Sequence, residues 1–333
     1  MAAATPQQLA DLIQEQQAAE AAALEDQVAE EADGGAGAKL AALLAVVLAA
    51  WVAAFGALTA AGAGVKLAGL LTRVRSDVDR AARGLDQRAQ RTLEEALDGA
   101  AQLGARHAAH FLTRATGRYH TAPTVAVPAD AIRAAAGLAD AVAEQLRLTA
   151  RLLTPRMISD SGWRGVLTGL AAARRSVTLI RQTIAWTIHR AINDGAAQTA
   201  DHYGARLLWV SEPDACVICL AYAGHISDRD GRFPGGLSMD PASRSSTAAA
   251  LDGPPAHPSC RCRAVPWMPD WDTGPGTLPD LLRDQAWRSI AAGQGRPSES
   301  RAARRRAAQA LLARRGLSAR VRRQAAATAG SRT

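Results

Sequence analysis

All four cysteines of the chain lie in one stretch, and their spacing could hold a metal ion. Cys216 and Cys219 are separated by two residues, and His257, Cys260 and Cys262 follow 37 residues later. Two thiolates at this spacing can reach one ion, and Zn²⁺ then needs two more ligands, for which the second group offers three candidates. The sequence therefore predicts a structural zinc site, since no glutamate or open-site motif accompanies these residues.

Two other states of these cysteines fit the same spacing. The thiols could be free and packed in a core, or they could form disulfides in an oxidising compartment. The N-terminus has Gln, Glu and Asp where a secretory signal would have a positive segment and an apolar run. We therefore expect a reducing interior, where clustered cysteines bind metal. Arg261 and Arg263 would offset the charge of several thiolates.

An enzymatic reading has less support in the sequence. His225, Asp228 and Asp230 lie close together, and a cysteine with a histidine elsewhere could form a nucleophile pair. The Asp and Gly pattern around them is more typical of turns, and there is no phosphate-binding or dinucleotide-binding glycine motif. We expect no enzyme. The remaining helical histidines, expected to be ordinary surface or core residues, are His107, His110, His189 and His202.

The charge of the chain is unevenly distributed. Its 333 residues have a formal net charge of +8, yet residues 1–33 contain eight acidic residues and no Lys or Arg, whereas residues 296–333 contain eleven Arg and one acid. Such a basic end would bind double-stranded DNA without sequence preference. A solvated tail, or contact with an acidic protein surface, fits equally. The candidate phosphate contacts are Arg301, Arg304, Arg305, Arg306, Arg314, Arg315, Arg320, Arg322 and Arg323.

Residues 40–65 form an uncharged run of 26 residues. As a helix this run would span the hydrocarbon core of a bilayer, about 30 Å thick. Its larger side chains, however, share one helix face, which favours packing against protein. That stripe is Leu40, Leu44, Val47, Trp51, Phe55 and Leu58. A multi-copy assembly of such Ala- and Gly-rich helices is a third interpretation.

The rest of the chain before the cysteines also favours helix, because Ala, Leu and Arg dominate it. Residues 5–33 predict a solvated helix or a partly disordered acidic arm. A long amphipathic helix is expected from Leu67 to Phe111, broken near Gly84 or Gly99, and another over residues 130–153. Asp160 and Ser161 could cap a last helix. The face that this helix would bury is Trp163, Val166, Leu170, Val177, Ile180, Ile184, Ile188 and Ile192.

Two short strands are expected on either side of the cysteine motif, at residues 206–210 and 261–267. Residues 209–267 resemble the C-terminal end of the phage Mu F-like family of head morphogenesis proteins, also called minor head proteins. The family's Arg-Thr-Glu run in the preceding helix is replaced by Trp186, Thr187 and Ile188. Together with the preceding helix, residues 172–200, which resembles the family's helix in position, the resemblance covers roughly a third of the chain, and both halves of the motif agree in order. The matching residues are Asp214, Cys216, Cys219, Leu220, Gly224, Pro254, Pro255, His257, Pro258, Cys260, Arg261 and Cys262.

This resemblance implies a minor structural protein of tailed phages or prophages. Family members associate with the portal and with head assembly, and some bind or travel with packaged DNA. The expected location is the head interior or portal of a virion assembled in a bacterial cytoplasm, in several copies. The alternative function is a membrane-active virion protein that inserts residues 40–65 during genome delivery.

The fold class that we expect is mainly α, with long helices followed by a small α+β metal-clipped module and a basic helical tail. Five segments are expected in chain order. They are an acidic arm (1–38), an apolar and a long amphipathic helix (39–120), a helical region (121–202), the cysteine module (203–270), and a Gly/Pro linker with an Arg-rich tail (271–333).

Overall fold

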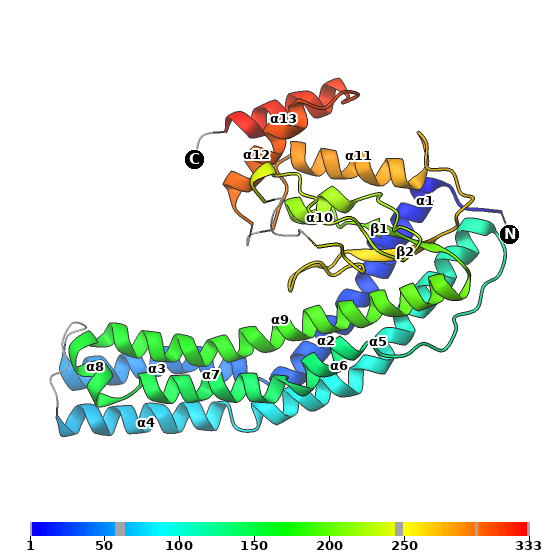
Figure 1. Ribbon diagram of the computed structural model, residues 1–333. Coiled ribbons are helices and arrows are strands. Elements are labelled where there is room, and N and C mark those ends of the chain that lie inside the picture. Colours follow the sequence, from blue (N-terminus) through cyan, green and yellow to red (C-terminus); the bar gives the residue numbers. More distant parts are fainter. Residues whose placement is uncertain (1, 57–63, 244–248, 297–298, 332–333) are drawn as a thin grey trace. The chain divides into compact units, whose positions relative to one another are not determined.

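The computed structural model describes residues 2–56, 64–243, 249–296 and 299–331, and its fold is mainly α, as expected (Figure 1). Helices hold 68% of the described residues and strands 4%. The chain forms two compact units that each gather distant segments. We call residues 1–24, 97–128 and 188–333 the cysteine unit, and residues 25–96 and 129–187 the bundle unit.

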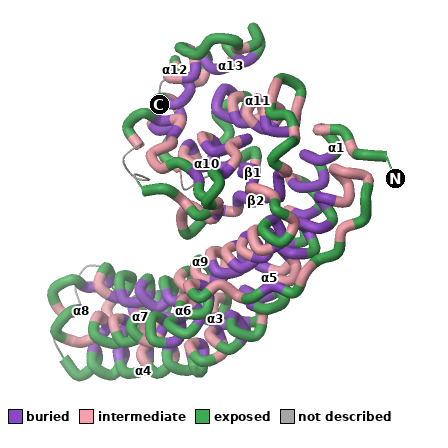
Figure 2. Tube along the Cα trace, turned by 45° about the vertical axis from the view of Figure 1, so that its right-hand side comes forward, coloured by how far each residue is buried: buried purple, intermediate pink, exposed green. Residues whose placement is uncertain are grey.

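The bundle unit consists of helices that bury one apolar face each (Figure 2). Its complete helices are α3 (Ala36–Phe55), α4 (Val65–Ala81), α6 (Ala129–Ala136), α7 (Leu138–Leu152) and α8 (Pro155–Ser161). Three further helices contribute residues to both units: α2 (Ala18–Asp33), α5 (Leu85–Thr116) and α9 (Trp163–His202).

Most of the helix predictions are confirmed, with two changes. The long amphipathic helix breaks at Gly84, where φ is +66°, and continues through Gly99. The helix expected over residues 130–153 is two helices, α6 and α7. Every residue of the face predicted for α9 is buried. The predicted cap is wrong, because Asp160 and Ser161 end α8 and Gly162 separates that helix from α9.

Helix α3 packs through the predicted stripe. Leu40, Val47 and Trp51 are buried, and the Trp51 ring lies 5.8 Å from that of Trp163. Leu58 lies outside the described residues. Among the described helices, α3 is the one that is long and apolar enough to cross a membrane, yet only 17% of its most apolar window is buried. Packing against the bundle therefore explains the apolar residues on only one side of this helix.

The cysteine unit is built on an antiparallel pair of strands, β1 (Arg206–Val210) and β2 (Arg263–Trp267), close to the predicted positions. The N-terminal helical turns α1 (Pro6–Asp11) and η1 (Leu12–Gln17) pack on this pair. Leu9, Ala10 and Ile13 share a core with Leu208 and Trp267. The expected solvated or disordered arm is therefore wrong for these residues, because their apolar positions form one buried face.

Four helices cover the remainder of the cysteine unit. They are α10 (Val217–Tyr222), α11 (Leu278–Ala291), α12 (Arg301–Leu312) and α13 (Ala319–Gly330). Ile290, Leu311 and Val321, one from each of the last three helices, are buried in the same core as Cys219 and Cys260. The segment expected to be a linker and tail is thus a packed part of this unit, and the alternative of a solvated tail is wrong for its inner face.

We expect His107 to make the cysteine unit less stable in acid. Burial lowers the pKa of His107 to about 4, and its neutral ring contacts Glu20 at 2.9 Å. Between the unfolded pKa near 6.5 and this value the unfolded chain binds a proton that the folded chain does not, so stability falls as pH falls, by up to about 3 kcal/mol. Urea unfolding from pH 7 to pH 4 measures this slope. His107→Gln should flatten it, and an unchanged slope would refute the assignment.

Candidate metal centre

The strand pair brings the two halves of the cysteine motif together. β1 ends at Val210 and β2 begins at Arg263, and these two residues are paired. Each strand end therefore delivers its neighbouring motif to the same place. Ser211 donates a hydrogen bond to the carbonyl of Cys219 at 2.6 Å, which ties the start of α10 to the strand.

Local turns aim the sulfur atoms. Cys216 precedes the first residue of α10 in an extended conformation, and its Sγ accepts from the amide of Cys219 at 3.5 Å. The backbone amide of Cys260 donates to the carbonyl of His257 at 2.9 Å, which closes a tight turn in the second half. Such amide-to-sulfur and turn geometry is what a thiolate pair around one ion requires.

The five candidate ligand atoms form two overlapping groups of three. His257 Nε2 lies 3.2 Å from Cys216 Sγ and 3.3 Å from Cys219 Sγ. Cys219 Sγ lies 3.5 Å from Cys260 Sγ. Two groups could each hold an ion, the first made of Cys216, Cys219 and His257 and the second of Cys219, Cys260 and Cys262. Cys219 belongs to both groups, so it is the centre of the cluster.

The pKa is lowered for some thiols of the cluster and raised for others. Hydrogen bonds with Cys219 and His257 lower the pKa of Cys216 to about 4 despite burial. Burial raises the pKa of Cys260, but hydrogen bonds with Cys219 and Cys262 hold it well below its usual value. For Cys262 a hydrogen bond with Cys219 lowers the pKa, and the effects of Cys260 and burial exceed it and raise the pKa to about 12. Cys216 and Cys260 are therefore the readiest thiolates.

Charged side chains from the C-terminal region surround the cluster. The carboxylate of Glu299 accepts from the amide of Val217 at 2.7 Å, at the first turn of α10. Arg304 holds that carboxylate through Nε at 2.7 Å and also donates to the carbonyl of Ala215 at 2.8 Å. This pair braces the turn that presents Cys216.

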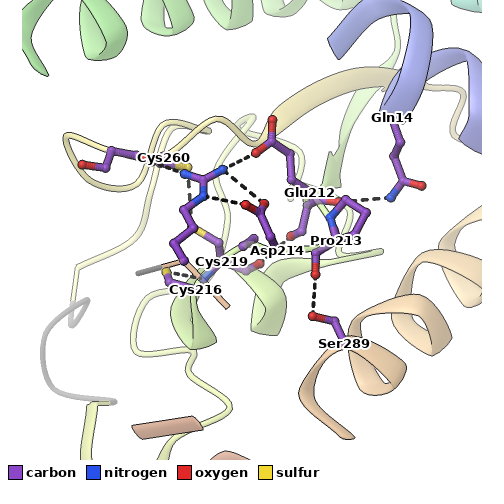
Figure 3. A network of polar contacts seen from close by, with 12 residues as sticks. Gln14, Glu212, Pro213, Asp214, Cys216, Cys219, Cys260 and Ser289 are labelled. Atoms are coloured by element: carbon purple, nitrogen blue, oxygen red, sulfur yellow. Dashed lines mark hydrogen bonds and ion pairs between the residues drawn. The ribbon is translucent and has the colours of Figure 1, made fainter. Parts of the chain in front are cut away.

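Two further carboxylates, those of Glu212 and Asp214, lie near the cluster (Figure 3). Arg296 pairs with Glu212 and Asp214 and donates to the carbonyl of Ser259. Burial raises the pKa of Glu212 to about 7, against the attraction of Arg296. Arg296 thus links both halves of the motif by contacting residues next to each of them.

The cluster is buried on one side and borders a cavity on the other. The cavity has a volume of about 300 Å³, and its walls include Cys216, Cys219 and His257, which gives an ion a path of entry. Arg263 is 5% exposed, and its Nε and Nη2 donate to no acceptor among the described residues. A buried guanidinium beside Cys262 suits a cluster that carries net negative charge.

The arginines predicted to contact phosphate fall into three groups. Arg304 is buried against Glu299, and Arg306 forms two hydrogen bonds with the buried Asp240. Arg304 is therefore not accessible to DNA, and the prediction that it contacts phosphate is wrong. Three others have partners near the surface: Arg305 with the carbonyl of Ser331, Arg314 with the Trp287 ring, and Arg322 with the carbonyls of Leu312 and Arg314. The exposed remainder is Arg301, Arg315, Arg320 and Arg323.

The loop that could have held a catalytic group forms a turn, as its sequence suggested. Asp228 Oδ1 accepts from the amides of Asp230 at 3.0 Å and Arg232 at 2.8 Å. The backbone carbonyl of His225 accepts from the amide of Trp209 at 2.8 Å. These contacts give Asp228 a structural role in the turn.

We expect Arg304→Ala to destabilise the cysteine unit by about 3 kcal/mol, because it leaves the buried Glu299 carboxylate without its cation. The matched control is Arg301→Ala, an exposed residue in the first turn of the same helix, which should change stability by less than about 0.5 kcal/mol. Urea unfolding followed by circular dichroism compares the two. Equal effects would show that the ion pair between Arg304 and Glu299 does not stabilise the cysteine unit.

The charged residues around the cluster were missed in the sequence, because Glu212, Arg296, Glu299 and Arg304 are spread over more than 90 residues without a motif. The one local signal is that Glu299 is the single acid in an arginine-rich segment.

No protein-family model matches this chain, and no curated protein or solved structure matches it.

Proposed function

We propose that this chain is a minor head protein of a tailed phage or prophage, related to the Mu F-like head morphogenesis family. The observation that supports this best is the meeting of the Cys216-Cys219 pair with the His257-Cys260 turn at the ends of paired strands. Those are the two halves of the motif that the resemblance rests on. The role is structural rather than enzymatic.

The proposed metal is a structural Zn²⁺ held by Cys216, Cys219, His257 and Cys260. These four atoms lie within contact distance of a neighbour in the set, and soft thiolates with one imidazole suit Zn²⁺. Cys262 is then the fourth thiol of the chain and the one candidate ligand that does not bind the ion, in keeping with its raised pKa. Cys260→Ser should lose the metal and Cys262→Ser should keep it. If Cys262→Ser lost the metal and Cys260→Ser kept it, Cys262 and not Cys260 would be the ligand.

In this role the helices of the bundle unit would dock on a portal protein or on the inner face of a capsid protein. The zinc would fix the cysteine unit so that it presents a constant surface. Quantitative mass spectrometry of purified heads from the phage or prophage that encodes the chain tests the proposal. We expect this protein in several copies per head, at a fixed ratio to the portal. Its absence from intact heads would refute the function while leaving the zinc site untouched.

Contact with packaged DNA is the part of this function that the exposed arginines support. We expect binding to duplex DNA that weakens steeply with salt, since each neutralised phosphate releases counterions. The combined substitution of Arg315, Arg320 and Arg323 by Gln should lower the magnitude of the slope of log K against log salt by about 2 to 3. The control is Arg306→Gln, whose partner is Asp240. An unchanged slope in the triple variant would show that Arg315, Arg320 and Arg323 do not contact DNA phosphates.

A further inference from the structure

Helix α3 of the bundle unit buries one face and leaves the opposite face both apolar and exposed. The packed stripe contains Leu40, Val47 and Trp51. Val46 is 59%, Val52 45% and Leu48 37% exposed on the other side. The helix therefore differs from an ordinary core helix, which hides its apolar residues. The exposed residues of α3 are Ala38, Lys39, Ala41, Ala42, Ala45, Val46, Leu48, Ala49, Val52 and Ala53.

The neighbouring helices show what a solvated face looks like in the same unit. Helix α4, which packs on α3 and α8, exposes Lys66, Arg73 and Asp79. Helix α3 has no charged residue between Leu40 and Phe55. Further large apolar side chains are exposed on the surrounding helices, where Val65 is 90% and Met157 50% exposed. Exposed apolar side chains of this unit are therefore not confined to α3.

Basic residues dominate the segments that carry this surface. Residues 40–75 and 144–175 contain nine Lys and Arg and only two acids, Glu144 and Asp160. The remainder of the bundle unit contains twelve acids and seven Lys and Arg. Lys66 and Arg156 are exposed and adjoin the exposed Val65 and Met157 in the sequence, and Arg164 is exposed three residues before the exposed Leu167. The unit therefore combines an exposed apolar helix face with exposed cations on the neighbouring segments.

We propose that this surface binds an anionic lipid bilayer, with α3 lying in the plane of the interface. Exposed Val and Leu side chains would enter the acyl boundary, and the surrounding cations would meet lipid phosphates. A second copy of the chain fits less well, because it would bring two basic surfaces together. Duplex DNA would leave the apolar face without a partner. The buried stripe keeps α3 attached to the bundle, so this differs from insertion of residues 40–65 across a membrane.

Co-sedimentation with vesicles tests the proposal, using the full chain and vesicles of phosphatidylglycerol and phosphatidylcholine in equal amounts. We expect binding that weakens with salt and is lost on phosphatidylcholine alone. The triple variant Val46→Gln, Leu48→Gln, Val52→Gln should bind at least about tenfold more weakly. Its control is Ile132→Gln, in which a residue of the same unit that is 50% exposed is changed. Ile132→Gln should bind as the unaltered chain does.

A second triple variant, Lys66→Gln, Arg156→Gln, Arg164→Gln, should also lose at least about tenfold, with Arg133→Gln as its control. The arginines of α13 attract anionic vesicles too, so the differences between variants and controls carry the test. Near-wild-type binding by the apolar triple variant would overturn the proposal. So would self-association of the chain in sedimentation velocity that this variant abolishes, since the face would then join two copies. Cys219→Ser should leave vesicle binding unchanged, which keeps this test separate from the metal centre.

Discussion

Replacing Cys219 by Ser is expected to abolish stoichiometric metal binding and to lower the free energy of unfolding of the cysteine unit by about 4 kcal/mol or more. Cys219 Sγ lies 3.3 Å from His257 Nε2 and 3.5 Å from Cys260 Sγ, and it belongs to both groups of candidate ligands. Structural zinc sites contribute on the order of 10 kcal/mol to the folding of small modules, so loss of the shared ligand removes a large part of that energy.

The size of this effect depends on the helices that complete the core. Helices α11, α12 and α13 add buried residues to the core around the cysteines, so we expect a folded but less stable unit rather than an unfolded one. The control is Ser259→Ala, an exposed residue inside the motif that offers no ligand. Thermal unfolding with and without a chelator measures the contribution of the metal. A chelator should destabilise the control and leave Cys219→Ser unchanged, and a Cys219→Ser protein that unfolds like the control would contradict the account.

Replacing Gly104 by Val is expected to destabilise the cysteine unit by about 3 kcal/mol or more. A Cβ atom at Gly104 would lie 1.8 Å from the carbonyl oxygen of Ile192, and one at Gly195 would lie 2.0 Å from that of Ala101. The two glycines therefore allow α5 and α9 to cross with their backbones in contact. Because both clashes involve backbone atoms, no change of rotamer can relieve them.

The matched control for this crossing is Gly99→Ala, in the same helix. A Cβ atom there would meet nothing within 4 Å. Alanine should stabilise this helical position by up to about 1 kcal/mol, since it has the higher helix propensity. Chemical unfolding of both variants gives the comparison. If Gly104→Val were no less stable than Gly99→Ala, the close crossing of α5 and α9 would be wrong.

The sequence sufficed for the features that depend on local periodicity or fixed spacing. The buried face of α9, from Trp163 to Ile192, follows the helical repeat of its apolar residues. The strand at Arg206–Val210 ends where the predicted strand ends. Cys216, Cys219 and His257 meet because the motif halves lie at paired strand ends. Each of these features is determined by residues that are close together in the sequence, or by motifs that directly adjoin such residues.

The features that sequence reasoning missed depend on contacts between distant segments. A run of arginines predicts a phosphate-binding surface, yet Arg304 and Arg306 are committed to Glu299 and Asp240. Net charge along the chain cannot distinguish an arginine with a buried carboxylate partner from a solvated one. The acidic composition of residues 5–33 likewise concealed the apolar side of α1, where Leu9 packs against the strand pair. Only the fold supplies these partners.

Metal content is the most direct test of the central claim. The full chain, purified under reducing conditions without chelators, should contain one equivalent of zinc by inductively coupled plasma mass spectrometry. Cys219→Ser prepared in the same way should contain almost none, and Ser259→Ala should contain as much as the unaltered chain. Less than about a tenth of an equivalent in the unaltered chain would contradict a structural zinc centre at Cys216, Cys219, His257 and Cys260.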